Sequence, residues 1–282
     1  YVDSAKLLEK IPTGTHVFIR EIQDLTTVEE VLKGGRVAGI FAEAPNNPQL
    51  ETPDIPRLRE LCDQYDAKLI LDPSAVGLVT LDLLPYADIV CTSLTKYAAS
   101  EGDVMAGLLA VNETRKDSPQ LIKDTQAVIE PLHVLDAEVL AEQIIKQKEV
   151  VEKMSQSAEI IAQKLVKHPA VATVRTAETV KTKENFKKLK RPGARSGSLI
   201  TIELKKEMRV VYDKLNCVKG PSFGLKFTLI SPYLWLAHFD EVTSEQGRKE
   251  IIKAGLNPDL LRISVGLEPV EEIWEMLENA LK

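Results

Sequence analysis

The sequence has few cysteines, no long apolar run and no surplus of basic residues, and each absence excludes a class of protein. Its three cysteines, Cys62, Cys91 and Cys217, are widely separated and form no Cys-x-x-Cys pair, so neither a disulfide framework nor a zinc site is expected. No apolar run approaches the roughly 20 residues that cross a bilayer, and nothing at the start resembles a signal peptide. We therefore expect a cytoplasmic protein with no membrane partner.

The charge pattern and the glycine pattern exclude two further classes. The formal net charge is −6 and the lysines and arginines are dispersed, which gives no electrostatic footprint for nucleic acid. The one basic cluster, Lys181–Arg195, contains a Pro-Gly pair and is expected to be a solvated loop. No G-x-G-x-x-G or Walker sequence is present, which disfavours a nucleotide-binding α/β protein.

The first half of the chain has the pattern of an α/β protein. Apolar runs with the length of short strands occur at His16–Ile19, Val37–Phe41, Lys68–Leu71, Ile89–Cys91 and Met105–Val111. Between them, Asp54–Tyr65 has apolar residues at helical spacing. Strands alternating with helices predict a mostly parallel sheet covered on both faces.

The pattern changes near residue 136. From Leu140 the apolar residues recur at intervals of three, four and seven up to His168–Pro169, which predicts one long amphipathic helix or a pair of helices. Ala170–Arg175 and Ser198–Leu204 alternate like antiparallel strands, and Pro269–Lys282 has the pattern of a closing helix. We expect two domains, residues 1–135 with the parallel sheet and residues 136–282 with the connecting helix and an α+β fold.

Polar residues follow two of the predicted strands of the first half. Asp72 ends one strand, and Ser93, Thr95 and Lys96 follow another, at the edge of an open α/β sheet where ligands bind. A desolvated lysine has a lowered pKa and can form a Schiff base with a carbonyl. An aspartate for a ring nitrogen and hydroxyls for a phosphate complete what pyridoxal phosphate needs. Each signal alone is weak, because a lysine after a strand is usually a surface residue and a strand-end aspartate often only caps a helix.

Several motifs together resemble one enzyme family. The segments E-A-P-N-N-P (Glu43–Pro48), T-S-L-T-K-Y (Thr92–Tyr97), G-D-V (Gly102–Val104) and R-I-S-V-G-L-E (Arg262–Glu268), with Asp72 between the first two, occur in the order of the Cys/Met-metabolism family. This family of pyridoxal-phosphate enzymes includes cystathionine γ-synthase, the cystathionine lyases and the homoserine-ester sulfhydrylases. Lys219–Leu229 most resembles the fungal-type cystathionine γ-synthase branch. The resemblance implies a fold-type I pyridoxal-phosphate transferase with an α+β C-terminal domain.

The resemblance also assigns roles to individual residues. It makes Lys96 the catalytic, cofactor-bound lysine, and gives cofactor-binding roles to Asp72, Ser93, Thr95, Asn47 and Ser74 and substrate-binding roles to Arg262, Thr228 and Asn47. Asp72 would face the pyridinium nitrogen, and Arg262 would grip the α-carboxylate with its planar fork. Two simpler explanations stay open: Ser93 and Thr95 could only cap a helix, and Arg262 could be a surface strand residue.

The implied reaction is γ-replacement on an O-acyl-homoserine by a thiol such as cysteine. A cystathionine β- or γ-lyase and a homoserine-ester sulfhydrylase are alternatives, because elimination shares the early proton transfers. Phe227 stands where family members that act at the γ-carbon commonly have glutamate, so the resemblance does not identify the distal group of the substrate. The resemblance also implies a dimer or tetramer with shared active sites.

Family members are longer at the N-terminus, where they supply part of the phosphate cup. We expect the sequence to be the later part of such a protein. The alternatives are a separate fragment that needs a partner chain, and a degenerate, non-catalytic subunit that keeps the fold and lacks half of the cofactor site.

Overall fold

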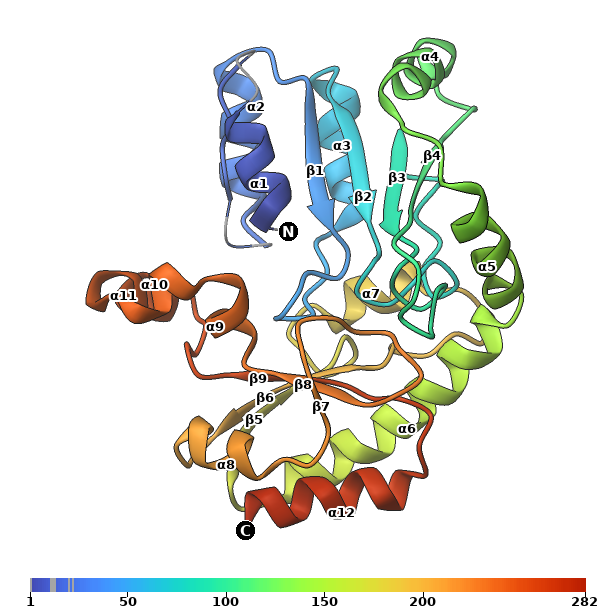
Figure 1. Cartoon of the computed structure of the whole chain (residues 1–282). Coiled ribbons are helices and arrows are strands. Elements are labelled where there is room, and N and C mark those ends of the chain that lie inside the picture. The colour runs from blue at the N-terminus through green and yellow to red at the C-terminus, as the bar shows by residue number, and fades with distance from the viewer. Residues whose placement is uncertain (1, 11–13, 20, 22) are drawn as a thin grey trace.

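The computed structural model describes residues 2–10, 14–19, 21 and 23–282. Its first sheet contains β1 (Gly39–Glu43), β2 (Lys68–Asp72), β3 (Ile89–Ser93) and β4 (Gly107–Val111), in that spatial order. The first three strands are parallel and β4 is antiparallel to β3. Figure 1 shows the helices α1 (Val2–Glu9) and α2 (Leu25–Gly34) beside β1, α3 (Ile55–Gln64) behind the sheet and α4 (Ser118–Val128) at its far end. The mostly parallel α/β sheet predicted from the sequence is confirmed.

The two faces of this sheet are covered to different extents. Leu58 and Leu61 of α3 pack against Leu69, Leu71 and Val90 of the strands in one apolar cluster. Asp54 begins α3 by accepting a hydrogen bond from the Arg57 N–H, and Pro56 lies in its first turn, as helix starts favour. On the other face Phe41 and Leu109 are 45% and 41% exposed. Because side chains alternate along a strand, the strand register puts Asp72 on this more open face.

The second sheet is built from the later part of the chain. It has the order β5 (Val171–Arg175), β6 (Leu199–Leu204), β9 (Leu261–Ser264), β8 (Leu229–Ser231) and β7 (Val218–Lys219). The pairs β5–β6, β6–β9 and β9–β8 are antiparallel. The predicted connecting helix is a pair, α5 (Val134–Ile144) and α6 (Gln147–Lys167). In Figure 1, α6 and α12 (Val270–Leu281) lie beneath this sheet, and their buried apolar faces share one core with it.

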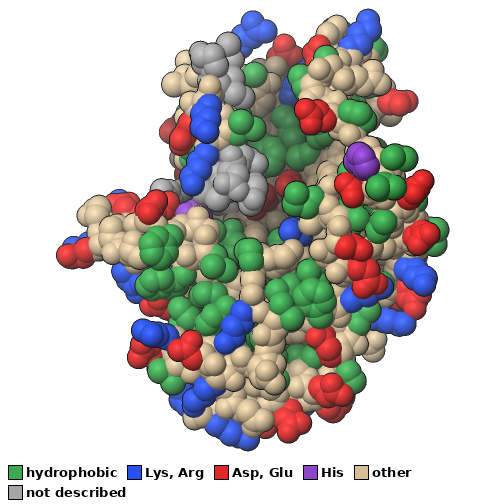
Figure 2. Space-filling model, in the orientation of Figure 1, with side chains coloured by type: hydrophobic (Ala, Val, Ile, Leu, Met, Phe, Trp, Pro, Cys, Tyr) green, Lys and Arg blue, Asp and Glu red, His purple; other side chains and the backbone are tan. Residues whose placement is uncertain are grey.

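Besides α7 (Lys183–Leu189), four shorter helices complete the described part of the chain. α8 (Met208–Lys214) packs on the second sheet. Between β8 and β9 the chain forms α9 (Tyr233–Ala237), α10 (Phe239–Thr243) and α11 (Glu245–Lys253). These three helices, which we call the lobe, project from the left side of the molecule (Figures 1 and 2). The lobe has its own small apolar core that includes Leu234, Val242 and Ile251.

Two local predictions are wrong. No strand forms at His16–Ile19, where Val17 and Phe18 are 59% and 54% exposed. An apolar run becomes a strand only where a neighbouring strand supplies hydrogen bonds, and within the described residues none pairs with this one. The basic cluster Lys181–Arg195 is not simply a solvated loop, because it contains α7 (Lys183–Leu189). Phe186 and Leu189 of α7 are buried against the core of the first sheet. The burial of these two apolar side chains holds the segment on the protein although the residues around them are charged.

The position of the domain boundary near residue 136 stays a prediction. The two sheets lie on either side of it in the sequence. However, α7 follows the boundary in the sequence and packs in the core of the first sheet. Packing therefore crosses the boundary that the sequence pattern suggests.

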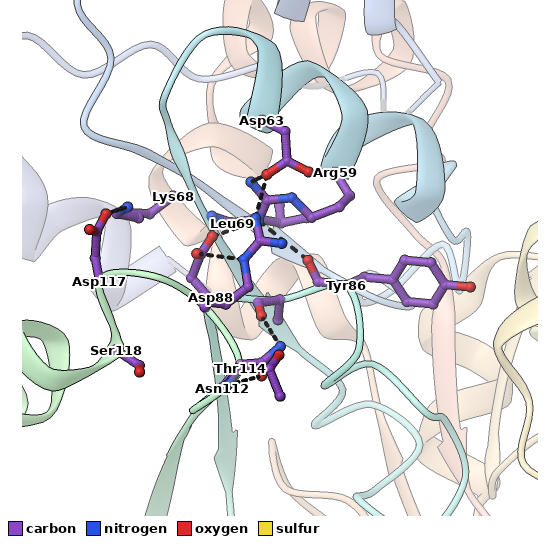
Figure 3. A network of polar contacts seen from close by, with 12 residues as sticks. Arg59, Asp63, Lys68, Leu69, Tyr86, Asp88, Asn112, Thr114, Asp117 and Ser118 are labelled. Atoms are coloured by element: carbon purple, nitrogen blue, oxygen red, sulfur yellow. Dashed lines mark hydrogen bonds and ion pairs between the residues drawn. The ribbon is translucent and has the colours of Figure 1, made fainter.

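A buried ion-pair network lies at the start of β2 and β3 (Figure 3). Asp88 is 2% exposed and accepts hydrogen bonds from the Leu69 N–H at 2.7 Å, from Arg59 Nη1 at 2.6 Å and from Arg115 Nε at 3.3 Å. Burial by itself raises the pKa of Asp88, but the hydrogen bonds and the two arginines outweigh burial and lower the pKa overall. The network thus fixes β2, β3 and α3 at the end of the sheet opposite Asp72.

We expect Asp88→Asn to lower the free energy of unfolding by about 3 kcal/mol at neutral pH, because it leaves two arginines without their buried counter-charge. Since the folded-state pKa of Asp88 is lowered, its contribution is present above the unfolded-state value of about 4 and is lost as the pH falls through the folded-state value. Urea unfolding at neutral and acidic pH measures both effects. Asp117→Asn, which removes an exposed ion pair with Lys68, is the control and should cost less than about 1 kcal/mol. Equal losses in the two variants would contradict the prediction.

Candidate active site

The ends of β2 and β3 bring three of the predicted site residues together. Asp72 is the last residue of β2 and Ser93 the last residue of β3. The Ser74 N–H donates to Asp72 Oδ1 at 2.8 Å, and the Ser74 hydroxyl accepts a hydrogen bond from the Ser93 N–H at 2.8 Å. Ser74 therefore holds the two strand ends together. Burial raises the pKa of Asp72, although hydrogen bonds from Ser74 act in the opposite direction.

Lys96 lies three residues beyond β3 and points to a loop of the later part of the chain. Its amine donates to Ser222 Oγ at 2.9 Å and lies 5.3 Å from the centroid of the Phe223 ring. Among the described residues no carboxylate pairs with it. Burial, helped by the charge of Arg262, lowers the pKa of Lys96 below its usual value. This environment favours the neutral, nucleophilic amine.

Arg262 lies in β9 and is only 2% exposed. Its guanidinium lies between two aromatic rings, 5.0 Å from the centroid of Phe223 and 4.9 Å from that of Tyr233. Nη2 donates to the carbonyls of Pro221 and Ser222, Nη1 lies 3.4 Å from Asn47 Oδ1, and Nε has no hydrogen-bond partner. Burial lowers the pKa of Arg262 to about 10, and no carboxylate in the described part of the chain neutralises it. Arg262 is therefore not a surface strand residue, and a buried arginine in this state suits an anionic ligand.

Asn47 reaches Arg262 from a loop 215 residues earlier in the sequence. The Asn47 N–H donates to Glu43 Oε2 at 3.0 Å, so the loop folds back on the end of β1. The next residue of this loop, Pro48, accepts a hydrogen bond from Thr201 Oγ1 of β6 at 2.6 Å. The second sheet thus positions this loop beside the buried guanidinium.

Two predicted ligands have their hydroxyls engaged within the protein. Thr95 Oγ1 accepts from the Ala106 N–H at 3.0 Å. Thr228 Oγ1 donates to Glu268 Oε2 at 2.9 Å and accepts from the Gly266 N–H at 3.0 Å. The roles of Thr95 at the phosphate and Thr228 at the substrate stay predictions that this geometry does not favour. The Ser93 hydroxyl has no hydrogen-bond partner among the residues that the structure describes, so it is the better candidate for the phosphate.

Ser222, Phe223 and Tyr233 are site residues to which the sequence analysis gave no role. The segment that contains Ser222 and Phe223 contributed to the resemblance, but nothing in the local pattern shows that it faces Lys96. Tyr233 begins a helix of the lobe. Only the packing of the second sheet against the first brings these side chains together.

The donor set fits pyridoxal phosphate. It offers a half-buried amine of lowered pKa for the aldehyde, a carboxylate for the ring nitrogen at the neighbouring strand end and an unused hydroxyl for the phosphate. Arg262 Nε, which has no hydrogen-bond partner among the described residues, is available to the carboxylate of a substrate. In the described ranges no group of His, Cys, Asp or Glu side chains is placed to hold a metal ion. No helix of these ranges is long and apolar enough to cross a membrane.

A half-buried lysine, a strand-end aspartate and a buried arginine on this α/β fold define a site for an aldehyde cofactor and a carboxylate-bearing substrate. A family model described as "Cys/Met metabolism PLP-dependent enzyme" matches residues 1–282. The chain therefore belongs to this family, and its cofactor is pyridoxal phosphate.

The curated relatives include different enzymes. The chain is 36% identical to L-2-amino-4-chloropent-4-enoate dechlorinase/desaturase of Streptantibioticus cattleyicolor, over 99% of this chain and 57% of that protein. It is 33% identical to cystathionine gamma-synthase of Neurospora crassa, over 100% of this chain and 45% of that protein. The chain thus spans about half the length of the curated relatives it matches.

Solved structures share the fold at lower identity. Cystathionine gamma-lyase from Lactobacillus plantarum, complexed with L-serine, superposes with a TM-score of 0.86 at 22% identity, covering 99% of this chain and 73% of that one. Cystathionine gamma synthase from Xanthomonas oryzae pv. oryzae, in complex with cystathionine, gives 0.86 at 21% identity, covering 100% and 72%. These likenesses show that the chain has the fold of these proteins, the fold-type I architecture.

The environment of Lys96 predicts an unusual pH dependence of its reactivity. Because its pKa is lowered, Lys96 of the folded, cofactor-free chain should acylate with a half-maximal rate at a lower pH than the same residue in the urea-unfolded chain. Pulse labelling with acetic anhydride across a pH series, followed by peptide mass spectrometry, measures Lys96 in both states. The same midpoint in the two states would show that Lys96 is not desolvated.

Proposed function

We propose that this chain carries the lysine and the carboxylate site of a pyridoxal-phosphate enzyme that acts at the γ-carbon of a 2-amino acid, in the manner of the trans-sulfuration enzymes. The observation that supports this most is the arrangement of two cations around one ring. Lys96 Nζ and the Arg262 guanidinium lie 5.3 Å and 5.0 Å from the centroid of Phe223. A substrate whose α-carboxylate binds Arg262 would thereby place its α-carbon toward the amine.

The proposal assigns the cofactor contacts to residues at the two strand ends. Lys96 would hold the cofactor through its aldehyde, Asp72 would face its ring nitrogen, and Ser93 would bind its phosphate. The bound cofactor supplies an electron sink that makes the α-proton of the substrate removable.

The remaining steps depend on side chains of this chain. Arg262 would orient the substrate. The rings of Phe223 and Tyr233 would hold the Arg262 guanidinium in one orientation, so that a substrate carboxylate binds to its edge. The Lys96 amine would take the α-proton, pass it on, and then, neutral again, take a β-proton, so that the γ-substituent can leave with the electron pair of its bond. Ser222 would keep the lysine amine beside the substrate between these transfers.

For the substrate we propose an O-acyl-homoserine, with a thiol such as cysteine as the incoming group. Two kinds of relative support action at the γ-carbon: the cystathionine gamma-synthases, and the dechlorinase, whose name places its chlorine on carbon 4 of a 2-amino acid. Phe227 offers no charge to the distal end of the substrate, which agrees with an uncharged or variable leaving group. A homo-oligomer with shared active sites and a cytoplasmic location complete the proposal.

A substrate panel tests the proposed reaction. The whole protein with pyridoxal phosphate is incubated with O-acetyl-, O-succinyl- and O-phosphohomoserine, with or without cysteine, and separately with cystathionine. We expect thioether product only when ester and thiol are both present, and no reaction with Lys96→Ala. Keto-acid release from cystathionine would indicate a lyase, and thioether formation from sulfide alone a sulfhydrylase. If the protein shows no visible absorbance after incubation with pyridoxal phosphate, it takes up no cofactor and is the non-catalytic subunit instead.

Arg262→Lys should weaken the binding of every accepted substrate. Lysine keeps the charge but loses the planar fork and the stacking between the two rings, so we expect KM to rise about 10- to 100-fold with a smaller change in kcat. The matched control is Arg248→Lys in the lobe, where the arginine pairs with Asp259 and KM should not change. Steady-state kinetics with the best substrate of the panel measures both variants, and unchanged KM in Arg262→Lys would remove the assigned carboxylate contact.

A further inference from the structure

Tyr97, the residue after Lys96, is fully buried and has an unusual backbone conformation. Its relative exposure is 0% and its φ is +63°. A bulky residue with a positive φ is uncommon and persists only where its surroundings hold it in place. The contacts of Tyr97 therefore determine the direction in which the chain leaves Lys96.

Three segments far apart in the sequence hold Tyr97. Its hydroxyl donates to the Ala75 carbonyl at 2.9 Å and accepts a hydrogen bond from Ser198 Oγ at 3.1 Å. Its N–H donates to the Gly224 carbonyl at 3.0 Å. Ala75 follows β2, whereas Ser198 and Gly224 belong to the second sheet and its loops. Burial raises the pKa of Tyr97 to about 12, so the phenol remains a neutral donor at any working pH.

Two glycines leave the space that the tyrosine occupies. A Cβ at Gly224 would lie 2.8 Å from the Tyr97 backbone nitrogen and 2.9 Å from its ring, closer than real contacts allow. A Cβ at Gly77 would lie 3.2 Å from the same ring. Both glycines have positive φ. The pocket is therefore shaped around this ring from both sheets.

The loop that receives Tyr97 is the same loop that receives the Lys96 amine. The Gly224 carbonyl accepts a hydrogen bond from the Tyr97 N–H, while Ser222 and Phe223, two and one residues earlier, contact the amine. The Tyr97 ring also packs edge-to-face on Phe223, with centroids 6.1 Å apart and an interplanar angle of 65°. Displacement of Tyr97 would thus move the side chains that surround the amine.

We propose that Tyr97 is a positioning residue for Lys96: its phenol, hydrogen-bonded to Ala75 and Ser198, holds the 221–224 loop against the lysine and keeps the half-buried amine beside Ser222 and Phe223. The inference depends on the proposed role of Lys96 as the cofactor lysine. It adds that the later part of the chain, through Ser198 and Gly224, helps to set the environment of that amine. Arg262 is the charged group that acts on the Lys96 amine, and from β9 it donates hydrogen bonds to the carbonyls of Pro221 and Ser222 in the same loop.

The test uses Tyr97→Phe and the milder Ser198→Ala in the full chain freed of cofactor. Pulse labelling with acetic anhydride over a pH series gives the titration midpoint of Lys96 in each variant. We expect this midpoint to rise toward the usual lysine value of 10.5 in Tyr97→Phe, because a loosened loop admits water. The shift should be in the same direction and smaller in Ser198→Ala, with the extent of labelling at the exposed Lys148 and Lys167 unchanged.

The control is Tyr212→Phe, which alters a half-buried tyrosine of α8. It should leave the Lys96 midpoint in place even if it lowers the melting temperature. A folded Tyr97→Phe that loses thermal stability but keeps the wild-type midpoint would overturn the proposal. If Tyr97→Phe does not fold, Ser198→Ala provides the test: a raised Lys96 midpoint supports the proposal, and a wild-type midpoint overturns it. Failure of the proposed function is detected separately, because Lys96→Ala would then still develop the visible absorbance of covalently bound cofactor.

Discussion

The structure depends on the burial of one tyrosine between two sheets. Tyr97 directly follows Lys96 and bonds to Ala75, Ser198 and Gly224, which come from three separate segments. A buried hydroxyl or N–H that lost such partners would be costly, so the three segments are held together. The edge of the first sheet and the loops of the second therefore meet at a fixed distance. The space between them is where the candidate site forms.

The site is built from charges that the protein leaves partly unsatisfied. Lys96, which is half-buried, and Arg262, which is buried, both lie beside the ring of Phe223, and burial lowers the pKa of each. In contrast, the arginines at the far end of the first sheet pair with Asp88 and Asp63. At that end the charges are neutralised for stability, whereas the site keeps an amine of lowered pKa that suits an aldehyde and an arginine that suits a carboxylate.

Much of the fold could be predicted because it follows from local pattern. The helix pair up to His168 follows from apolar residues at helical spacing, and the strands at Lys68–Asp72 and Ile89–Ser93 follow from short apolar runs of strand length with β-branched residues. The failures at His16–Ile19 and Lys181–Arg195 have one cause. Whether an apolar run finds a strand partner, or an apolar pair such as Phe186 and Leu189 finds a core, depends on what packs against it.

By itself the sequence determined the family, the two kinds of sheet and the placement of Asp72, Ser93 and Lys96 at strand ends, because these depend on residue order and periodicity. Only the tertiary structure decided that Ser222 and Phe223 face the lysine, that Asn47 meets Arg262, and that the hydroxyls of Thr95 and Thr228 bond within the protein. The physical reason is that a side chain bonds to whatever lies within about 3 Å of it. Which group lies there is set by how distant segments pack together, and no local pattern contains that information.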